Sequence, residues 1–192
     1  MQPLILHTSE VLTLTDDELF RLCAANRDLR IERDSQGNLI LMAPAGGETS
    51  ARNSLFIADL VIWNRETRLG IAFDSNGGFI LPNGAMRAPD ASWIPIERWH
   101  QLGAEERKKF LPLCPDFVIE LRSPSDRLKD LQKKMQEWMD NGCRLGWLID
   151  PVEEKTYVYR ENSENSVVES FDEALSGEGV LPGFELELKE LL

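Results

Sequence analysis

The sequence predicts an α/β (α+β) fold in which helices flank a mixed β-sheet. Apolar segments in the order strand, helix, strand over residues 116–149 imply a right-handed crossover between two parallel strands. Turn signals between earlier apolar segments imply antiparallel hairpins. The 192 residues are 42% hydrophobic and contain no repeat or Gly/Ser-rich linker. We therefore expect a single domain over residues 1–192.

Periodicity, caps and turn residues define the expected elements. We expect helices over residues 16–26, 48–65, 97–102, 104–110 and 127–141. We expect strands over residues 29–34, 39–43, 71–73, 79–81, 88–94, 116–122, 145–149, 156–160 and 167–170, and an amphipathic segment after residues 181–184.

Local signals support three of the helices. Thr15 and Glu18 have the spacing of a capping box at the start of the first helix. Asp126 can cap the helix that follows it, and Gly142 is a natural stop. The helix over residues 48–65 carries apolar residues on a broad face, so we expect much of it to be buried.

Charge and composition narrow the function. The net charge of −12 argues against a protein that coats nucleic acid, since such proteins present a basic surface, but it allows a local basic cleft. No window approaches ~18 consecutive apolar residues, and a signal-peptide pattern is missing, so we expect a cytoplasmic protein without a membrane partner. Three scattered cysteines suit reduced thiols, and the two histidines form no zinc pattern.

The strand over residues 116–122 carries one interior acid, Glu120. Alternation places Glu120 and Arg122 on one face and only apolar residues on the other, which should pack on a helix layer. Burying a carboxylate is costly unless a cation neutralises it. A metal ion could do so, and a structural ion pair with Arg122 or another cation explains the placement equally well.

Two further acids could join Glu120. Asp90 lies among small and apolar residues on a neighbouring expected strand, although an Asp after proline is also a common turn former. Magnesium prefers oxygen ligands, often one or two carboxylates plus waters. Glu48 opens the long helix, where the helix dipole favours an acid in any protein, or where it could serve as a third acid.

The helix over residues 127–141 offers a lysine. At about 100° per residue its apolar residues form one stripe. Lys134 flanks that stripe beside Leu131 and Trp138, whereas Lys133 lies almost opposite and should be solvated. A flanking lysine can bury its stem and turn its ammonium toward a cleft. An ordinary surface lysine is the alternative interpretation.

These residues together resemble the Uma-type putative restriction endonuclease family, within the PD-(D/E)XK, restriction-endonuclease-like superfamily. The resemblance extends from about Thr15 to Leu188. Its carriers are residues 42–48, 87–93, 114–126, 134–142, 145–151 and 181–184. Each segment alone is weak evidence for the resemblance, but their order and spacing together are specific to the family.

The resemblance implies a restriction-endonuclease-like mixed β-sheet core flanked by helices, and a site where Asp90 and Glu120 converge. It implies that these two acids hold magnesium (or manganese), that Glu48 supports the metal site, and that Lys134 orients the attacking water. The usual lysine of the superfamily lies two residues after the glutamate, where this chain has Arg122. Arginine is a poor base but can stabilise phosphate charge.

The leading hypothesis is therefore metal-dependent hydrolysis of DNA by an endonuclease that acts as a possible homodimer. The alternative is a non-catalytic nuclease-like scaffold that binds protein or nucleic acid, which the net charge and Arg122 favour. A third hypothesis is a small-molecule phosphoesterase with the same metal chemistry, although the chain lacks a Gly-rich phosphate-binding motif.

Overall fold

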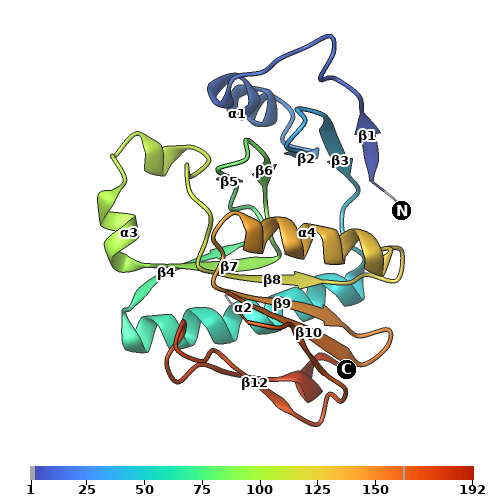
Figure 1. Cartoon of the computed structure of the whole chain (residues 1–192), viewed down its shortest axis with the longest axis vertical. Coiled ribbons are helices and arrows are strands. Elements are labelled where there is room, and N and C mark those ends of the chain that lie inside the picture. Colours follow the sequence, from blue (N-terminus) through green and yellow to red (C-terminus); the bar gives the residue numbers. More distant parts are fainter. Residues whose placement is uncertain (1–2, 162) are drawn as a thin grey trace.

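The structure, a computed structural model, describes residues 3–161 and 163–192 (Figure 1). The helices are α1 (Asp16–Ala25), α2 (Gly47–Thr67), α3 (Ile96–Gln101) and α4 (Leu128–Asp140), with 3-10 helices over Glu106–Lys108 and Leu188–Leu191. The strands are β1 (Leu4–Leu6), β2 (Arg30–Arg33), β3 (Leu39–Met42), β4 (Gly70–Asp74), β5 (Phe79–Ile80), β6 (Met86–Arg87), β7 (Ala91–Pro95), β8 (Phe117–Leu121), β9 (Leu145–Asp150), β10 (Lys155–Arg160), β11 (Ser166–Val168), β12 (Ala174–Ser176) and β13 (Glu185–Glu187).

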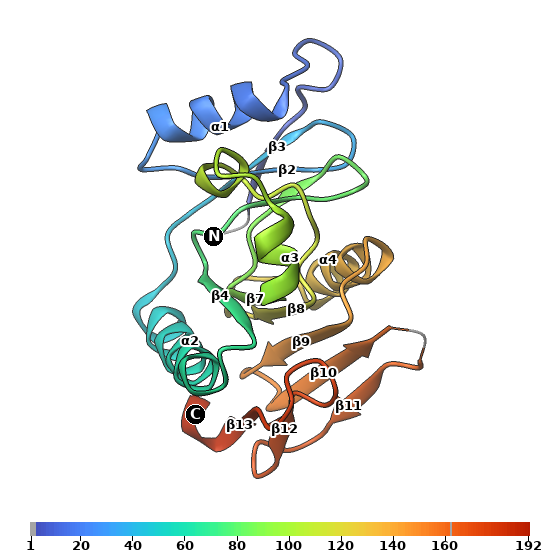
Figure 2. The ribbon, with the colours of Figure 1, turned by 90° about the vertical axis from the view of Figure 1, so that its left-hand side faces the viewer.

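The centre of the fold is a mixed sheet with the strand order β11-β10-β9-β8-β7-β4. Strand β8 pairs in parallel with β9 and antiparallel with β7. Helix α4 connects the two parallel strands, as the strand–helix–strand pattern predicts. Helices α2 and α4 cover opposite faces of this sheet (Figure 2). The predicted mixed sheet flanked by helices is thus confirmed.

The two faces of β8 follow the predicted alternation. Phe117, Ile119 and Leu121 pack in one apolar cluster with Phe56 and Leu60 of α2. The other face of β8 packs on α4, where Val118 joins a second apolar cluster that includes Met135 and Trp138. Glu120 therefore sits on the α4 face of a strand that is buried along its whole length.

A second sheet, in the order β1-β3-β2-β6-β5, lies above the first in Figures 1 and 2. The predicted hairpin forms its centre, with Arg30 opposite Met42 and Arg33 opposite Leu39. Helix α1 begins with the predicted capping box, in which Thr15 and Glu18 satisfy each other's backbone N–H groups. The second sheet also carries β6, which brings the segment just before Asp90 next to β2.

The long helix α2 is less buried than predicted. Leu55 and Ile62 are 42% and 56% exposed, and Val61 is also exposed. Only the face that carries Phe56, Leu60 and Trp63 contacts the sheet. The prediction was wrong because one helix touches a flat sheet along a single stripe, whatever residues its other sides carry.

Two further expectations need correction. Helix α4 begins at Leu128 with Arg127 in the N-cap position, so Asp126 does not cap it. The Asp126 carboxylate instead accepts a hydrogen bond from the backbone N–H of Ser123 and closes a turn. The strand expected over residues 88–94 begins only at Ala91, so Asp90 precedes it. Gly142 ends α4 with a φ of 101°, as predicted.

Three smaller points complete the comparison. The described cysteines are free thiols, as predicted. Strands β1, β6, β12 and β13 were not expected, because each covers only two or three residues. Among the residues described, we find no helix whose length and apolar character suffice to cross a bilayer.

Candidate functional site

Asp90 lies just before β7, and contacts from two elements fix its position. Its backbone N–H donates to the carbonyl of Ile119, at 3.0 Å, which ties it to β8. Its Oδ2 accepts from the backbone N–H of Leu121 at 2.8 Å, and its Oδ1 accepts from Nδ2 of Asn53 at 3.1 Å. The carboxylate is thus held between β8 and α2.

Glu120 is buried beside it, with 4% of its surface exposed. Nε1 of Trp138 donates to its Oε1 at 2.9 Å, and Nζ of Lys134 lies 2.8 Å from Oε1 and 3.1 Å from Oε2. Burial, helped by the negative charges of Asp90 and Glu32 and opposed by Lys134, raises the pKa of Glu120 to about 7. Glu120 is therefore ionised only in part near neutral pH.

Lys134 has the position that the helical projection predicts. Its Nζ contacts Glu120 and also lies 3.1 Å from Oε1 of Glu32 and 3.5 Å from the carbonyl oxygen of Ala88. Burial tends to lower the pKa of Lys134, but Glu120 and Glu32 outweigh this effect and raise it. Lys133, by contrast, is 81% exposed and lies 3.8 Å from Asp130.

Glu32 belongs to β2 and was missed by the sequence analysis. Its carboxylate is 2% exposed and also pairs with Nη1 of Arg87 at 3.0 Å. Arg87 in turn lies 2.6 Å from Glu137 of α4. Burial opposes the ionisation of Glu32, but Lys134 and Arg87 lower its pKa overall. An acid inside a predicted strand was the available signal, as it was for Glu120.

The buried charges thus alternate in sign along one chain of contacts. We call this set the charge network, and its members in order are Glu137, Arg87, Glu32, Lys134 and Glu120. Glu32 and Arg87 come from the upper sheet, whereas the other three come from β8 and α4. The network therefore joins the two sheets at the candidate site.

Two predicted site residues do not join this arrangement. Arg122 follows directly after β8, and it lies 2.6 Å from Asp150 and 3.2 Å from Glu153. Glu48 has an 85% exposed side chain, and its described ion-pair partner is Arg52 at 3.9 Å. Within the described part of the chain, neither contacts Asp90, Glu120 or Lys134. The structure thus brings together Asp90, Glu120 and Lys134 and leaves the other two outside.

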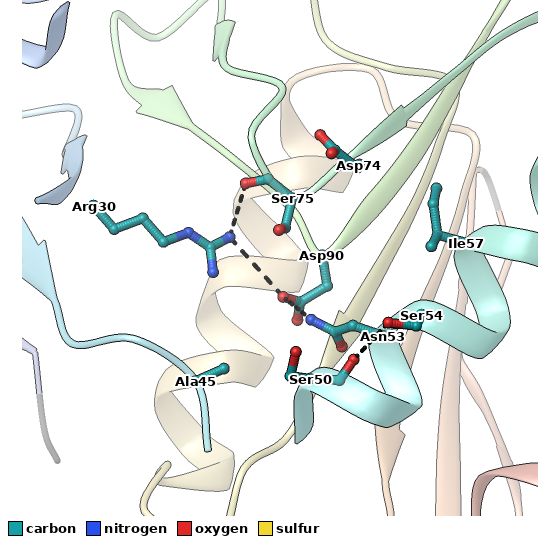
Figure 3. A pocket seen from close by; sticks show the side chains of 9 residues that line it. All are labelled: Arg30, Ala45, Ser50, Asn53, Ser54, Ile57, Asp74, Ser75 and Asp90. Atoms are coloured by element: carbon teal, nitrogen blue, oxygen red, sulfur yellow. Dashed lines mark hydrogen bonds and ion pairs between the residues drawn. The ribbon is translucent and has the colours of Figure 1, made fainter. Parts of the chain in front are cut away.

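A pocket of about 290 Å³ opens on the α2 side of Asp90 (Figure 3). Its lining residues are Arg30, Ala45, Ser50, Asn53, Ser54, Ile57, Asp74, Ser75 and Asp90. Arg30 is the one cation among them; its Nη2 donates to the carbonyl of Ser75 at 3.0 Å and lies 4.0 Å from Asp90. The sequence analysis missed Arg30, because a basic residue in a hairpin strand is common.

Two buried polar atoms in this pocket lack a partner within the described chain. They are Oδ1 of Asn53, an acceptor, and Nε of Arg30, a donor. Buried polar groups are nearly always hydrogen-bonded in native proteins. An unpaired acceptor and an unpaired donor beside Asp90 therefore suit a ligand that carries both positive and negative charge, such as a cation with a phosphate.

The donor set fits a hard divalent cation. The described residues contain no group of three or more His, Cys, Asp and Glu that could hold a metal. Magnesium, however, is commonly bound by one or two carboxylates with waters in its other positions. Asp90, just before β7, and Glu120, on the adjacent strand β8, supply two carboxylates, and the unpaired Oδ1 of Asn53 adds a neutral oxygen. Glu48 does not line the pocket, and its exposed side chain pairs with Arg52.

Comparisons with known proteins support the fold and the family. The model of the Uma2 family, described as "Putative restriction endonuclease", matches residues 16–189. Among solved structures, the crystal structure of a putative nuclease from Anabaena variabilis superposes with a TM-score of 0.75. The two chains are 24% identical, and the match covers 93% of this chain and 97% of the other, a likeness of fold. The comparison with curated proteins gave no match.

Proposed function

Because the chain belongs to the Uma2 family of putative restriction endonucleases, we propose that it hydrolyses phosphodiester bonds of DNA with the help of a divalent metal ion. The observation that supports this proposal most is the buried pair of Glu120 and Lys134 next to Asp90. Glu120 and Lys134 are in contact, and Asp90, which accepts a hydrogen bond from the backbone of Leu121, lines the polar pocket.

Asp90 and Glu120 would hold the ion, and the amide oxygen of Asn53 is the third candidate donor. When bound, a divalent ion lowers the pKa of a coordinated water and polarises the phosphate. The elevated pKa of Glu120, about 7, supports this role. A carboxylate that remains partly protonated beside one lysine has capacity for a second positive charge.

Lys134 supplies a permanent positive charge in this site. Its raised pKa keeps the ammonium protonated at neutral pH, so it donates hydrogen bonds and does not act as a base. Held at Glu120, the ammonium can orient the attacking water and offset the negative charge that develops on the phosphate. The family resemblance implies the same role for Lys134.

Arg30 is our candidate for the phosphate-binding role first expected of Arg122. Arg122 is engaged by Asp150 and Glu153, whereas Arg30 lines the pocket beside Asp90. Its planar guanidinium can pair with two phosphate oxygens at once. Arg30 gives this pocket a positive charge in a chain whose net charge is −12.

A non-catalytic, nuclease-like scaffold is the second candidate, and one observation favours it. Both carboxylate oxygens of Glu120 already accept hydrogen bonds, from Lys134 and Trp138, and the residue is almost inaccessible. A scaffold of this kind would bind protein or nucleic acid without cleavage. It predicts that divalent ions do not bind at Asp90 and Glu120.

Calorimetric titration with Mn²⁺ separates the two candidates. We expect saturable binding to the wild-type protein, loss of binding in Asp90→Asn and Glu120→Gln, and unchanged binding in the control Asp130→Asn. Asp130 is an exposed acid of α4 that pairs with Lys133. The titration is repeated with a short DNA duplex present. Absence of wild-type binding in both conditions, together with no cleavage of plasmid DNA, would reject the nuclease.

A further inference from the structure

Glu32 makes an unusually complete set of contacts for a residue outside the proposed metal ligands. Its carboxylate accepts from Nζ of Lys134 at 3.1 Å, from Nη1 of Arg87 at 3.0 Å and from the backbone N–H of Ala88 at 3.1 Å. Its exposed fraction is 2%. Burying a carboxylate costs free energy unless it is paired and hydrogen-bonded, and here three donors meet that need.

These contacts also fix the ammonium of Lys134. A lysine side chain is a flexible four-carbon stem with three N–H donors, so one contact leaves it free to swing. Nζ of Lys134 has Glu120 on one side, Glu32 on the other and the carbonyl of Ala88 as a longer third contact. Without Glu32, the ammonium would keep one charged partner and lose the opposing one.

We propose that Glu32 is a positioning residue that holds the Lys134 ammonium against Glu120. Its catalytic meaning rests on the proposed nuclease function, but the anchoring itself is measurable without cleavage. Glu32 reaches the reacting groups only through Lys134, and it does so from a different sheet. The catalytic lysine of one layer is thus oriented by an acid of the other.

Glu137 provides a matched control for this proposal. Both glutamates pair with Arg87, at 3.0 Å for Glu32 and 2.6 Å for Glu137. Of the two, Glu32 is the one with a described contact to Lys134. A purely structural role exerted through Arg87 would make Glu32→Gln and Glu137→Gln behave alike. A positioning role predicts that they differ.

The first test measures the reactivity of the lysines. The folded protein is treated briefly with acetic anhydride, and modification is quantified by peptide mass spectrometry, with exposed Lys133 as the internal reference. We expect Lys134 to react at least tenfold more slowly than Lys133 in the wild type. Glu32→Gln should accelerate modification of Lys134 at least threefold, and Glu137→Gln should change it less than twofold. Equal rates for Lys134 in both variants would overturn the proposal.

The second test measures cleavage. Glu32→Gln should lower kcat at least tenfold while KM changes less than twofold, because the substrate-binding pocket lacks Glu32. Glu137→Gln should leave kcat within twofold. Glu32→Asp, which keeps the charge on a shorter stem, should recover part of the lost rate. If Glu32→Gln does not fold, Glu32→Asp replaces it in both tests.

The outcomes keep the two proposals apart. A wild-type protein that neither binds metal nor cleaves DNA contradicts the proposed function, and the labelling rates then decide the anchoring by themselves. A wild-type protein that cleaves, with equal kcat in Glu32→Gln and Glu137→Gln, contradicts the positioning role alone.

Discussion

The two faces of β8 are equally buried but differ in what they bury. One face places Phe117, Ile119 and Leu121 against α2, in an apolar cluster without charges. The other face places Glu120 against α4, in a network of buried charges. Apolar burial stabilises the fold by roughly 25 cal/mol per Å². Buried ion pairs often add little net stability, because desolvation offsets their attraction.

Under the proposed function, this contrast assigns stability and chemistry to opposite sides of a single strand. Changes on the α2 face should alter the free energy of unfolding and spare the rate of cleavage per folded molecule. Isosteric changes on the α4 face should chiefly lower the rate of cleavage. Four predictions test this division, from the largest expected effect to the smallest.

The largest effect should come from Glu120→Gln. Under the proposed function we expect cleavage to fall at least a thousandfold, which is about 4 kcal/mol in activation free energy. Glutamine keeps the shape and can still accept from Trp138, so the far-UV and near-UV circular dichroism should stay native. Alanine is a poorer choice, because it also removes the hydrogen-bond acceptor of Lys134 and Trp138 and leaves a cavity. Cleavage within tenfold of wild type would show that Glu120 is not part of the chemistry.

Phe117→Ala tests the opposite face. Phe117 is fully buried and contacts Trp147 edge-to-face at 4.8 Å between ring centroids. We expect a loss of about 3–5 kcal/mol in the free energy of unfolding, measured by urea denaturation, because the truncation leaves a cavity. Cleavage per folded molecule, measured well below the unfolding transition, should stay within threefold. A large loss of rate at unchanged stability would contradict the division of roles.

The third prediction concerns pH. The pKa of Glu120 is about 7 in the folded chain against an ordinary value of 4.5, so between these limits the folded state binds a proton that the unfolded state lacks. The free energy of unfolding should therefore fall as pH rises through this window, by up to about 3 kcal/mol. Glu32, with its lowered pKa, affects the free energy of unfolding only below this pH window, and Lys134, with its raised pKa, affects it only above the window.

Glu120→Gln removes this titration and provides the control. Urea denaturation of both proteins at four pH values between 4.5 and 7.5 gives the difference in stability directly. We expect the free energy of unfolding of the variant to increase relative to that of the wild type as pH rises. If the difference in the free energy of unfolding between the two proteins stays constant from pH 4.5 to 7.5, Glu120 does not titrate in this range, and the prediction is wrong.

The smallest effect should come from Arg122→Gln. Arg122 follows directly after β8 and pairs with Asp150, whose side chain is fully buried. Loss of that charged partner should cost about 1–3 kcal/mol in the free energy of unfolding. Cleavage per folded molecule should change less than threefold. A hundredfold loss of cleavage would show that Arg122 does contribute to the candidate site.

The sequence predicted the parts of the site that depend on local geometry. Alternation along β8 separated Glu120 from its apolar neighbours, and the helical projection distinguished Lys134 from Lys133. Both patterns arise from fixed backbone periods of 2 and 3.6 residues. Asp90 was found through its apolar surroundings, although it precedes its strand and is not part of it.

The rest of the site depends on contacts between distant segments. Glu32 and Arg30 reach the site because the hairpin packs beside β6, and no local pattern encodes that packing. The exposure of Leu55 and Ile62 could not be predicted for a related reason. Periodicity shows which residues share a helix face, but it does not show which face another element covers.

The contact between Glu32 and Lys134 also sets an order of events during synthesis. The ribosome delivers Glu32 102 residues before Lys134. Closing a loop of that length is entropically costly, and the contact forms only after the β2–β3 hairpin and α4 both exist. A nascent chain that ends before α4 has the two candidate metal-binding acids but no lysine to orient water between them. Under the proposed function, an unfinished chain cannot cut DNA.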